Sequence, residues 1–240
     1  MNPIRAVLFD VDGTLVDSND AHAHAWVEAF AAAGITVDYD KVRCSIGMGG
    51  DKLMPAVSGI EEDSAEGQRI ARLRGDIFKA KYLPTLKPFR DAGALVSALR
   101  ARGVSATAAS SAKRDELESL LKIAAATSLL GAAASSDDAD ESKPDPDILH
   151  AALKKVKATP DEAVMIGDTP YDVEAAARAG VIAIAFRCGG WSDEALTGAA
   201  AIYDGPWDLC AALERSAPLD RRAFPEELLR RDAGAFSHRR

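Results

Sequence analysis

Short apolar runs alternate with helical patterns along most of this chain, and that alternation constrains the fold more than any other feature. The apolar runs cover residues 4–9, 104–109, 163–167 and 181–186, with a weaker fifth at 200–203. The helical patterns cover residues 90–102, 113–122, 145–157 and 171–179. Such alternation is typical of a parallel sheet with helices on both faces. The sequence therefore predicts an α/β fold, in which ligands gather at the carboxyl ends of the strands.

The alternation stops after the first strand. Only helical patterns follow there, at residues 20–33, 39–44, 51–57 and 61–82, with a glycine-rich break at 47–50. Pro84 and Pro88 then mark a linker back to the sheet. We expect residues 17–83 to form an inserted α-helical cap, and residues 1–16 and 84–240 to form the core. The segment from Ser216 onward is expected to add a surface helix and a frayed end.

Charge, hydropathy and cysteine usage exclude several function classes. A formal net charge of −8 over 240 residues argues against a nucleic-acid partner, which normally requires a basic face. There is no signal-like N-terminus and no apolar run of the roughly 20 residues that a membrane span needs. Three widely spaced cysteines form neither a disulfide framework nor a zinc pattern. We therefore expect a cytoplasmic protein, as a monomer or homodimer, that binds no membrane.

The most specific motif is Asp10-Val11-Asp12-Gly13-Thr14, directly after the first apolar run. Gly13 permits a turn there, so that both carboxylates can face a cavity. One carboxylate can attack phosphorus, and the other can protonate the leaving oxygen and later deprotonate water. A calcium loop would continue with further oxygen ligands, whereas this chain continues with Leu15. The motif therefore indicates phosphoryl-transfer chemistry.

A second acidic motif, Gly167-Asp168-Thr169-Pro170-Tyr171-Asp172, follows the third strand. Carboxylates at the same sheet edge as Asp10 and Asp12 suit a hard cation such as Mg²⁺. The alternative is that Asp168 or Thr169 only caps the following helix. The pairing with a second strand end favours the metal site.

Two other segments offer groups that could offset negative charge or hold a phosphate oxygen. Lys143, in Ser142-Lys143-Pro144, is a candidate partner for the carboxylates, which need cationic compensation. Ser110 and Ser111 follow the second strand at a helix start, where a hydroxyl and backbone N–H groups suit a phosphate oxygen. One of these serines could instead cap the helix.

Together these motifs resemble the haloacid dehalogenase superfamily, in particular its phosphatases with a helical cap after the first strand. The resemblance implies a Rossmann-like core with a mobile cap and an aspartyl-phosphate intermediate. It makes Asp10 the nucleophile and Asp12 the general acid–base, with Ser110 and Lys143 holding the transferring phosphoryl group. Mg²⁺ would be bound by Asp10, the backbone carbonyl of Asp12 and Asp168, with Asp172 as a further ligand or as a hydrogen-bond acceptor behind the ligands. The implied activity is Mg²⁺-dependent hydrolysis of a small phosphorylated metabolite.

The cap carries the expected substrate contacts, and it also bears on the alternatives. We expect His22 and the loop residues Gly49, Gly50 and Lys52, together with Ser111, to bind substrate. The first alternative is a β-phosphoglucomutase-like phosphomutase, but the arginine that such mutases place in this loop is missing, and only Arg43 could substitute. A non-catalytic binding module is the remote alternative. For Trp26 we favour packing in the core. For Trp191 we give equal weight to covering the core and to contacting the substrate.

Overall fold

The computed structural model describes residues 3–130 and 133–215. Its centre is a five-stranded parallel sheet in the order β2-β1-β3-β4-β5. The strands are β1 (Ala6–Phe9), β2 (Ser105–Ala108), β3 (Ala163–Gly167), β4 (Ile182–Phe186) and β5 (Ala201–Tyr203). Each lies within two residues of a run predicted from the sequence. The α/β, Rossmann-like prediction is therefore confirmed.

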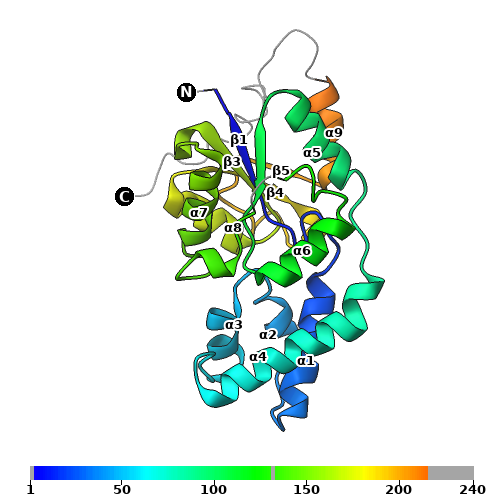
Figure 1. Cartoon of the computed structure of the whole chain (residues 1–240), viewed down its shortest axis with the longest axis vertical. Helices are drawn as coiled ribbons and strands as arrows, with labels where there is room; N and C mark the ends of the chain where they lie inside the picture. Colours follow the sequence, from blue (N-terminus) through cyan, green and yellow to red (C-terminus); the bar gives the residue numbers. More distant parts are fainter. Residues whose placement is uncertain (1–2, 131–132, 216–240) are drawn as a thin grey trace.

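Helices cover both faces of this sheet (Figure 1). Helices α5 (Ala92–Ala101), α6 (Arg114–Ile123) and α9 (Pro206–Arg215) pack with Val7 and Phe9 of β1 in one apolar cluster. Helices α7 (Asp147–Val156) and α8 (Pro170–Ala179) pack with Ala6 and Leu8 in another. All four β1 side chains are buried because successive residues of the strand point to opposite, covered faces. Helix α9 was not predicted.

The helical insertion forms a second body below the sheet in Figure 1. It comprises α1 (Asn19–Ala32), α2 (Tyr39–Arg43), α3 (Gly50–Ser58), α4 (Ala65–Ile77) and the π-helix η1 (Phe78–Tyr82). These helices enclose an apolar cluster of their own, which contains Trp26, Phe30 and Ile70. Trp26 is thus a core residue, as favoured from the sequence. We call residues 19–82 the cap; the boundaries expected at 16/17 and 83/84 stay a prediction.

Local signals explain where key helices begin and end. The Thr169 side chain accepts a hydrogen bond from the Asp172 N–H in a capping box, Pro170 fills the first helical position of α8, and Gly180 ends it with φ 71°. Ser64 caps α4 by accepting from the Gly67 N–H at 3.0 Å. The remaining short turns are 3₁₀ helices: η2 (Leu83–Thr85), η3 (Ser136–Asp138), η4 (Pro160–Glu162) and η5 (Arg187–Gly189).

The strand order places a switch point between β1 and β3. The chain passes from β1 outward to β2 and then returns to the other side of β1 for β3. Crevices at such points bind ligands in open α/β sheets. Phe9 pairs with Ile166, so Asp10 and the segment starting at Gly167 leave the sheet side by side. Within the described residues, no helix has the length and apolar character needed to cross a bilayer.

Phe30→Ala tests whether the cap depends on its own apolar cluster. Phe30 is fully buried, so its removal should lower the free energy of unfolding by about 3–5 kcal/mol through lost burial and a residual cavity. Urea denaturation followed by tryptophan fluorescence measures the change. Glu66→Ala, at an exposed position on α4, is the control and should shift stability by less than about 0.5 kcal/mol. Equal effects of the two changes would contradict an independent cap core.

Candidate active site

Asp10 lies at the end of β1, where it meets a buried lysine. The Lys143 ammonium lies 2.6 Å from Asp10 Oδ1 and 2.8 Å from Asp172 Oδ1, and the lysine is 1% exposed. Burial alone would lower the pKa of Lys143, but the two carboxylates outweigh it and raise that pKa. Lys143 therefore stays protonated and is held beside Asp10 and Asp172. The structure brings Asp10, Lys143 and Asp172 together as the sequence predicted.

Asp168 is held in a tight pocket of small residues and hydrogen-bond donors. Thr14 Oγ1 donates to Asp168 Oδ1 at 2.8 Å, and Asn19 Nδ2 donates to Asp168 Oδ2 at 2.8 Å. A Cβ on Gly13 would lie 2.3 Å from Asp168 Oδ2, and one on Gly189 would lie 1.8 Å from the same oxygen. Gly13 has φ 75° in addition, so the turn after Asp12 and the approach of Asp168 both require glycine there.

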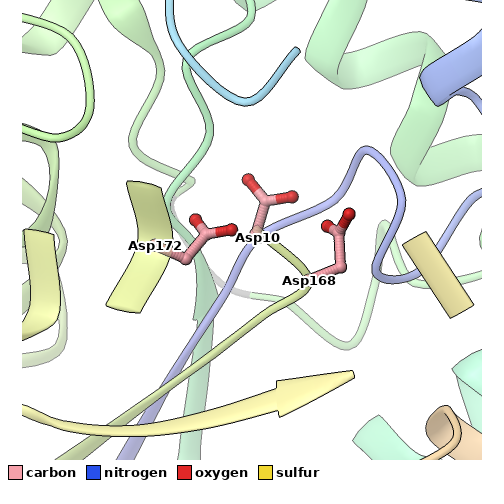
Figure 2. A group of neighbouring side chains, drawn as sticks. All are labelled: Asp10, Asp168 and Asp172. Carbon is pink, nitrogen blue, oxygen red and sulfur yellow. The ribbon is translucent and has the colours of Figure 1, made fainter. Parts of the chain in front are cut away.

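Asp10, Asp168 and Asp172 point toward one another at this sheet edge (Figure 2). One carboxylate oxygen from each lies within 4.8 Å of the others, and all three residues are buried. Burial raises the pKa of Asp10 despite the nearby Lys143, while Asp172 and Asp168 raise it further. Burial and Asp172 raise the pKa of Asp168 to about 7. Three buried carboxylates therefore share a single ammonium, and this all-oxygen donor set could hold a metal ion.

Asp172 has a structural role as well. Its Oδ2 accepts hydrogen bonds from Thr169 Oγ1 at 2.7 Å and from the Thr169 N–H at 3.1 Å. The helix-capping alternative is thus correct for Thr169 and not for Asp168. Asp172 Oδ1 remains directed at Lys143, so Asp172 serves both the start of α8 and the acidic group.

Asp12 points away from the other three carboxylates, toward the cap. Ser18 Oγ donates to Asp12 Oδ1 at 2.5 Å, and His22 Nε2 lies 2.6 Å from the same oxygen. Burial opposes ionisation of Asp12, but the contacts with His22 and Ser18 outweigh it and lower its pKa. The side chain of Asp12 is thus separate from the acidic triad, and binding of a metal by its backbone carbonyl stays a prediction.

His22 continues into a chain of polar contacts that joins cap and core. Arg74 of α4 donates to His22 Nδ1, so the other ring nitrogen, Nε2, carries the proton donated to Asp12. Arg74 Nη1 also binds both carboxylate oxygens of Glu116 on α6, at 3.0 and 2.7 Å. His22 itself stacks on Phe78 with 4.1 Å between ring centroids. The cap histidine is therefore held in one orientation and one tautomer.

Ser110 and Ser111 lie beside this group at the end of β2. Ser110 is 1% exposed, and its Oγ accepts from the Ala112 N–H at 3.1 Å. Ser111 Oγ donates to the Gly47 carbonyl of the cap at 3.3 Å. Lys113 occupies the N-cap position of α6, so neither serine caps that helix as the alternative supposed. Both serines line the cavity described next.

A cavity of about 580 Å³ lies between the cap and the carboxyl edge of the sheet. Asp10, Asp12, His22, Ser110 and Ser111 line it, together with Gly49 and Gly50 of the cap loop. Gly49 touches the core directly, because its N–H donates to Ser142 Oγ at 3.0 Å. A Cβ on Gly49 would lie 2.6 Å from Ser142 Cβ. The glycine thus permits this close approach of cap and core.

Three residues that the sequence offered as substrate contacts make other contacts in the structure. Lys52 is not among the cavity-lining residues; its ammonium pairs with Asp145 and, at 3.0 Å, with Glu141. Arg43, the possible substitute for a mutase arginine, binds Asp20 Oδ1 and the Gly189 carbonyl, each at 2.6 Å. Trp191 packs at the edge of the second core cluster and against Tyr171, outside the cavity lining.

Several residues of the site were missed in the sequence. They are Thr14, Ser18, Asn19, Arg74, Glu116 and Ser142. Ser18 and Asn19 carried a signal, since they adjoin the acidic motif at the start of a helix. Arg74 and Glu116 carried none, because their contact depends on how α4 and α6 are placed in three dimensions.

The comparisons with known proteins agree with this fold and site. The family model for haloacid dehalogenase-like hydrolases matches residues 7–186. A phosphoglycolate phosphatase of Rhodospirillum rubrum is 31% identical, over 83% of this chain and 87% of its own length. A crystal structure of a hydrolase from Pseudomonas syringae superposes with a TM-score of 0.82 at 28% identity, covering 90% of this chain and all of the other.

A third relative is much longer. The chloroplastic protein SUPPRESSOR OF QUENCHING 1 of Arabidopsis thaliana is 32% identical over 77% of this chain, which spans 18% of that protein's length. The match to the family model covers most of the chain and includes the whole acidic site. The chain belongs to the haloacid dehalogenase-like hydrolase family.

Gly49→Val tests the close contact between cap loop and core. The added side chain overlaps Ser142, and overpacking of this kind costs about 1–3 kcal/mol, so kcat/KM should fall about tenfold or more. Steady-state kinetics on the best substrate measures the loss.

Gly49→Ala is the matched control for this prediction. Its single methyl group meets the same neighbours but adds less volume than valine, so Gly49→Ala should lower kcat/KM less than Gly49→Val does. No effect of Gly49→Val, or an equal effect of the two changes, would contradict the role given to this contact.

Metal binding should strengthen as pH rises through about 7. The raised pKa of Asp168 means that metal-free folded protein holds a proton that the unfolded chain releases near pH 4, so metal-free stability falls between these values. A cation replaces that proton, and the increase in Tm caused by Mg²⁺ should therefore be larger at about pH 8 than at about pH 5.5. Differential scanning fluorimetry with Mg²⁺ or EDTA measures it.

Asp168→Asn supplies the control, because it removes the titrating group while keeping the shape of the side chain. Metal-free Asp168→Asn protein should show a smaller decline in stability toward pH 7, the remainder being due to Asp10, whose pKa is also raised, and it should gain little from Mg²⁺. A Mg²⁺-induced shift that is independent of pH in the parent protein would contradict the assignment.

Proposed function

We propose that this chain is a Mg²⁺-dependent phosphatase that removes phosphate from a small phosphorylated metabolite. One observation carries the proposal: Asp10 lines the cavity between cap and core, and a buried lysine and two further carboxylates lie beside it. The family and the phosphatase relative support it. A cytoplasmic location and a monomeric or homodimeric state stay predictions, as does the absence of a nucleic-acid partner.

The reaction proposed has two steps. Asp12 takes up a proton before the first step, because its lowered pKa leaves it ionised in the substrate-free protein. Asp10 then attacks phosphorus, the bond to the ester oxygen breaks, and Asp12 gives this proton to the leaving oxygen. A water molecule then attacks the aspartyl-phosphate and loses its proton to Asp12. The phosphorus bond to Asp10 breaks, so that phosphate is released and both aspartates return to their starting states. His22 and Ser18 orient the Asp12 carboxyl for both proton transfers.

Three side chains are proposed to hold the transferring phosphoryl group and to offset its charge. Ser110 offers its hydroxyl from the end of β2, and Ser111 offers a second one beside it. Lys143 is fixed against Asp10, so its charge offsets the negative charge that gathers around the attacked phosphorus. His22, Gly49 and Gly50 complete the lining on the cap side. Lys52 is not proposed as a substrate contact, given its pairing with Glu141 and Asp145.

Asp10, Asp168 and Asp172 are the residues proposed to hold Mg²⁺. The set fits this ion because all of its donors are carboxylate oxygens, and because its negative charge exceeds what Lys143 can offset. When bound, Mg²⁺ supplies a positive charge that screens the phosphoryl oxygens from the attacking carboxylate. The identity of the metal rests on this donor set and on the resemblance to the family.

The two alternatives receive less support. A phosphomutase must grip a second phosphate, and Arg43 already binds Asp20 and the Gly189 carbonyl. A binding module would not need a buried lysine and four carboxylates in this arrangement, and the family is one of hydrolases.

The Asp10→Asn variant distinguishes the proposed phosphatase from the phosphomutase and the binding module. Phosphate release from a panel of phosphorylated metabolites should fall about a thousandfold or more, because the amide is no nucleophile, and EDTA should abolish release by the parent protein. A colorimetric phosphate assay measures both. Asp17→Asn is the matched control, since Asp17 is exposed and outside the cavity lining, and it should keep parental activity. Full activity of Asp10→Asn would overturn the proposed mechanism, and bisphosphate-dependent isomerisation without phosphate release would favour the mutase.

A further inference from the structure

The part of the cavity beyond the reacting aspartates is unusually rich in carboxylates. Apart from Asp10 and Asp12, eight acidic side chains line it against four basic ones. A substrate in this family member must place its phosphoryl group at Asp10 and the rest of its structure against these remaining side chains. Their charge therefore acts on the leaving group of the substrate.

Two of the four basic side chains are already neutralised. Arg74 binds both oxygens of Glu116, and Lys79 binds Asp115. Each pair joins the cap to helix α6 of the core, so neither cation can turn to a ligand without breaking a contact between the two bodies. The remaining basic residues of the lining are Arg72 and Lys113.

Five lining carboxylates have no ion pair among the described residues. They come from the cap and from the core loop before Lys143: Asp51, Glu62, Asp76, Asp137 and Asp140. Burial raises the pKa of Glu62, Lys113 opposes that rise and Asp51 adds to it. Lys113 is thus engaged electrostatically by Glu62. The field in the distal cavity is negative even after Arg72 and Lys113 are counted.

This field discriminates between leaving groups that carry different charges. A carboxylate or a second phosphate on the substrate would meet unpaired carboxylates and would have few free cations to bind. A hydroxylated group could donate hydrogen bonds to the same oxygens, and an ammonium group would gain attraction as well. Repulsion of the wrong ligand is a common source of specificity.

We propose that the distal cavity selects phosphate monoesters whose leaving group is an amino-bearing polyol, such as an amino sugar, and rejects those with a second anionic group. The inference rests on the proposed phosphatase function and specifies the substrate class of the same site. The carboxylates that carry it are Glu62 on the cap side and Asp140 on the core side. The side chains at both positions line the cavity and are absent from the proposed reaction steps.

Three hexose derivatives of nearly equal size provide the test. Glucosamine 6-phosphate carries an ammonium group, glucose 6-phosphate is neutral beyond its phosphate, and 6-phosphogluconate carries a carboxylate. With the Mg²⁺-loaded protein, kcat/KM should decrease in that order. The difference between the amine and the carboxylate should be roughly tenfold or more, since each unpaired charge at cavity distances contributes roughly threefold to tenfold. Added salt should reduce the difference.

Matched variants show whether the named carboxylates are responsible. Glu62→Gln and Asp140→Asn each remove one charge and keep the shape. Glu62 is half-buried, so its change should reduce the ratio of amine to carboxylate turnover roughly threefold. Asp140 is exposed and more strongly screened by water, so its change should reduce the ratio less, and the double variant should reduce it most. Glu66→Gln, at an exposed position outside the cavity lining, should leave the ratio unchanged. An unchanged ratio in the double variant overturns the proposal, as does an equal or reversed order of the three compounds in the parent protein.

Binding to Mg²⁺-loaded Asp10→Asn protein separates this inference from the phosphatase proposal. Calorimetric titration with the three compounds reads the charge preference without turnover. The same order in Kd supports the charge selection even if the parent protein releases no phosphate. Failure to bind glucosamine 6-phosphate, or tighter binding of 6-phosphogluconate, overturns it even if the parent protein is an active phosphatase.

Discussion

The contact of Lys143 with Asp10 and Asp172 is the interaction on which the rest of the site depends. Three buried carboxylates from two strand ends repel one another, and without a nearby cation they would take up protons rather than stay ionised. The ammonium lies within 2.8 Å of two of them and is itself buried, so its charge is hardly screened by water. It enters from the loop before α7, and the fold must therefore bring three segments together before Asp10 can be an anion.

Two different environments separate the roles of Asp10 and Asp12, although only one residue lies between them. Asp10 faces the sheet edge and other carboxylates, which raise its pKa together with burial. Asp12 faces the cap, where His22 and Ser18 lower its pKa. The turn at Gly13 produces this divergence, because it sends the chain out of the sheet and toward α1. Differences of this kind allow two like groups to act as nucleophile and as proton carrier.

The sequence contained enough information for the sheet and for the core aspartates. Buried parallel strands are continuous apolar runs, and polar residues at their carboxyl ends must meet, so Asp10, Asp168 and Asp172 could be grouped without a structure. Lys143 follows no strand; it was added as the cation that these carboxylates need and by the resemblance to the family. Residues 61–82 were harder: α4 begins only at Ala65, and the chain changes to a π-helix at Phe78. Arg74 of α4 pairs with Glu116 of α6, 42 residues further along the chain. The helical periodicity of a sequence contains no information on such contacts between helices. Lys52 was expected to contact substrate because it is the nearest cation to the cap-loop glycines, but its side chain turns to Asp145 and Glu141.

Gly13 and Gly189 both crowd around Asp168, but Gly189 is synthesised long after Gly13 and the cap. The nucleophile and the whole cap leave the ribosome early, since synthesis runs from the N-terminus. The carbonyl of Gly189 accepts from Asn19 at 3.2 Å and from Arg43 at 2.6 Å, so the cap gains these anchors only after β4 has been synthesised. A nascent chain that ends before this point has its reactive aspartate but an unfinished enclosure around it. The enclosure around Asp10 is therefore complete only when almost the entire sheet has been synthesised.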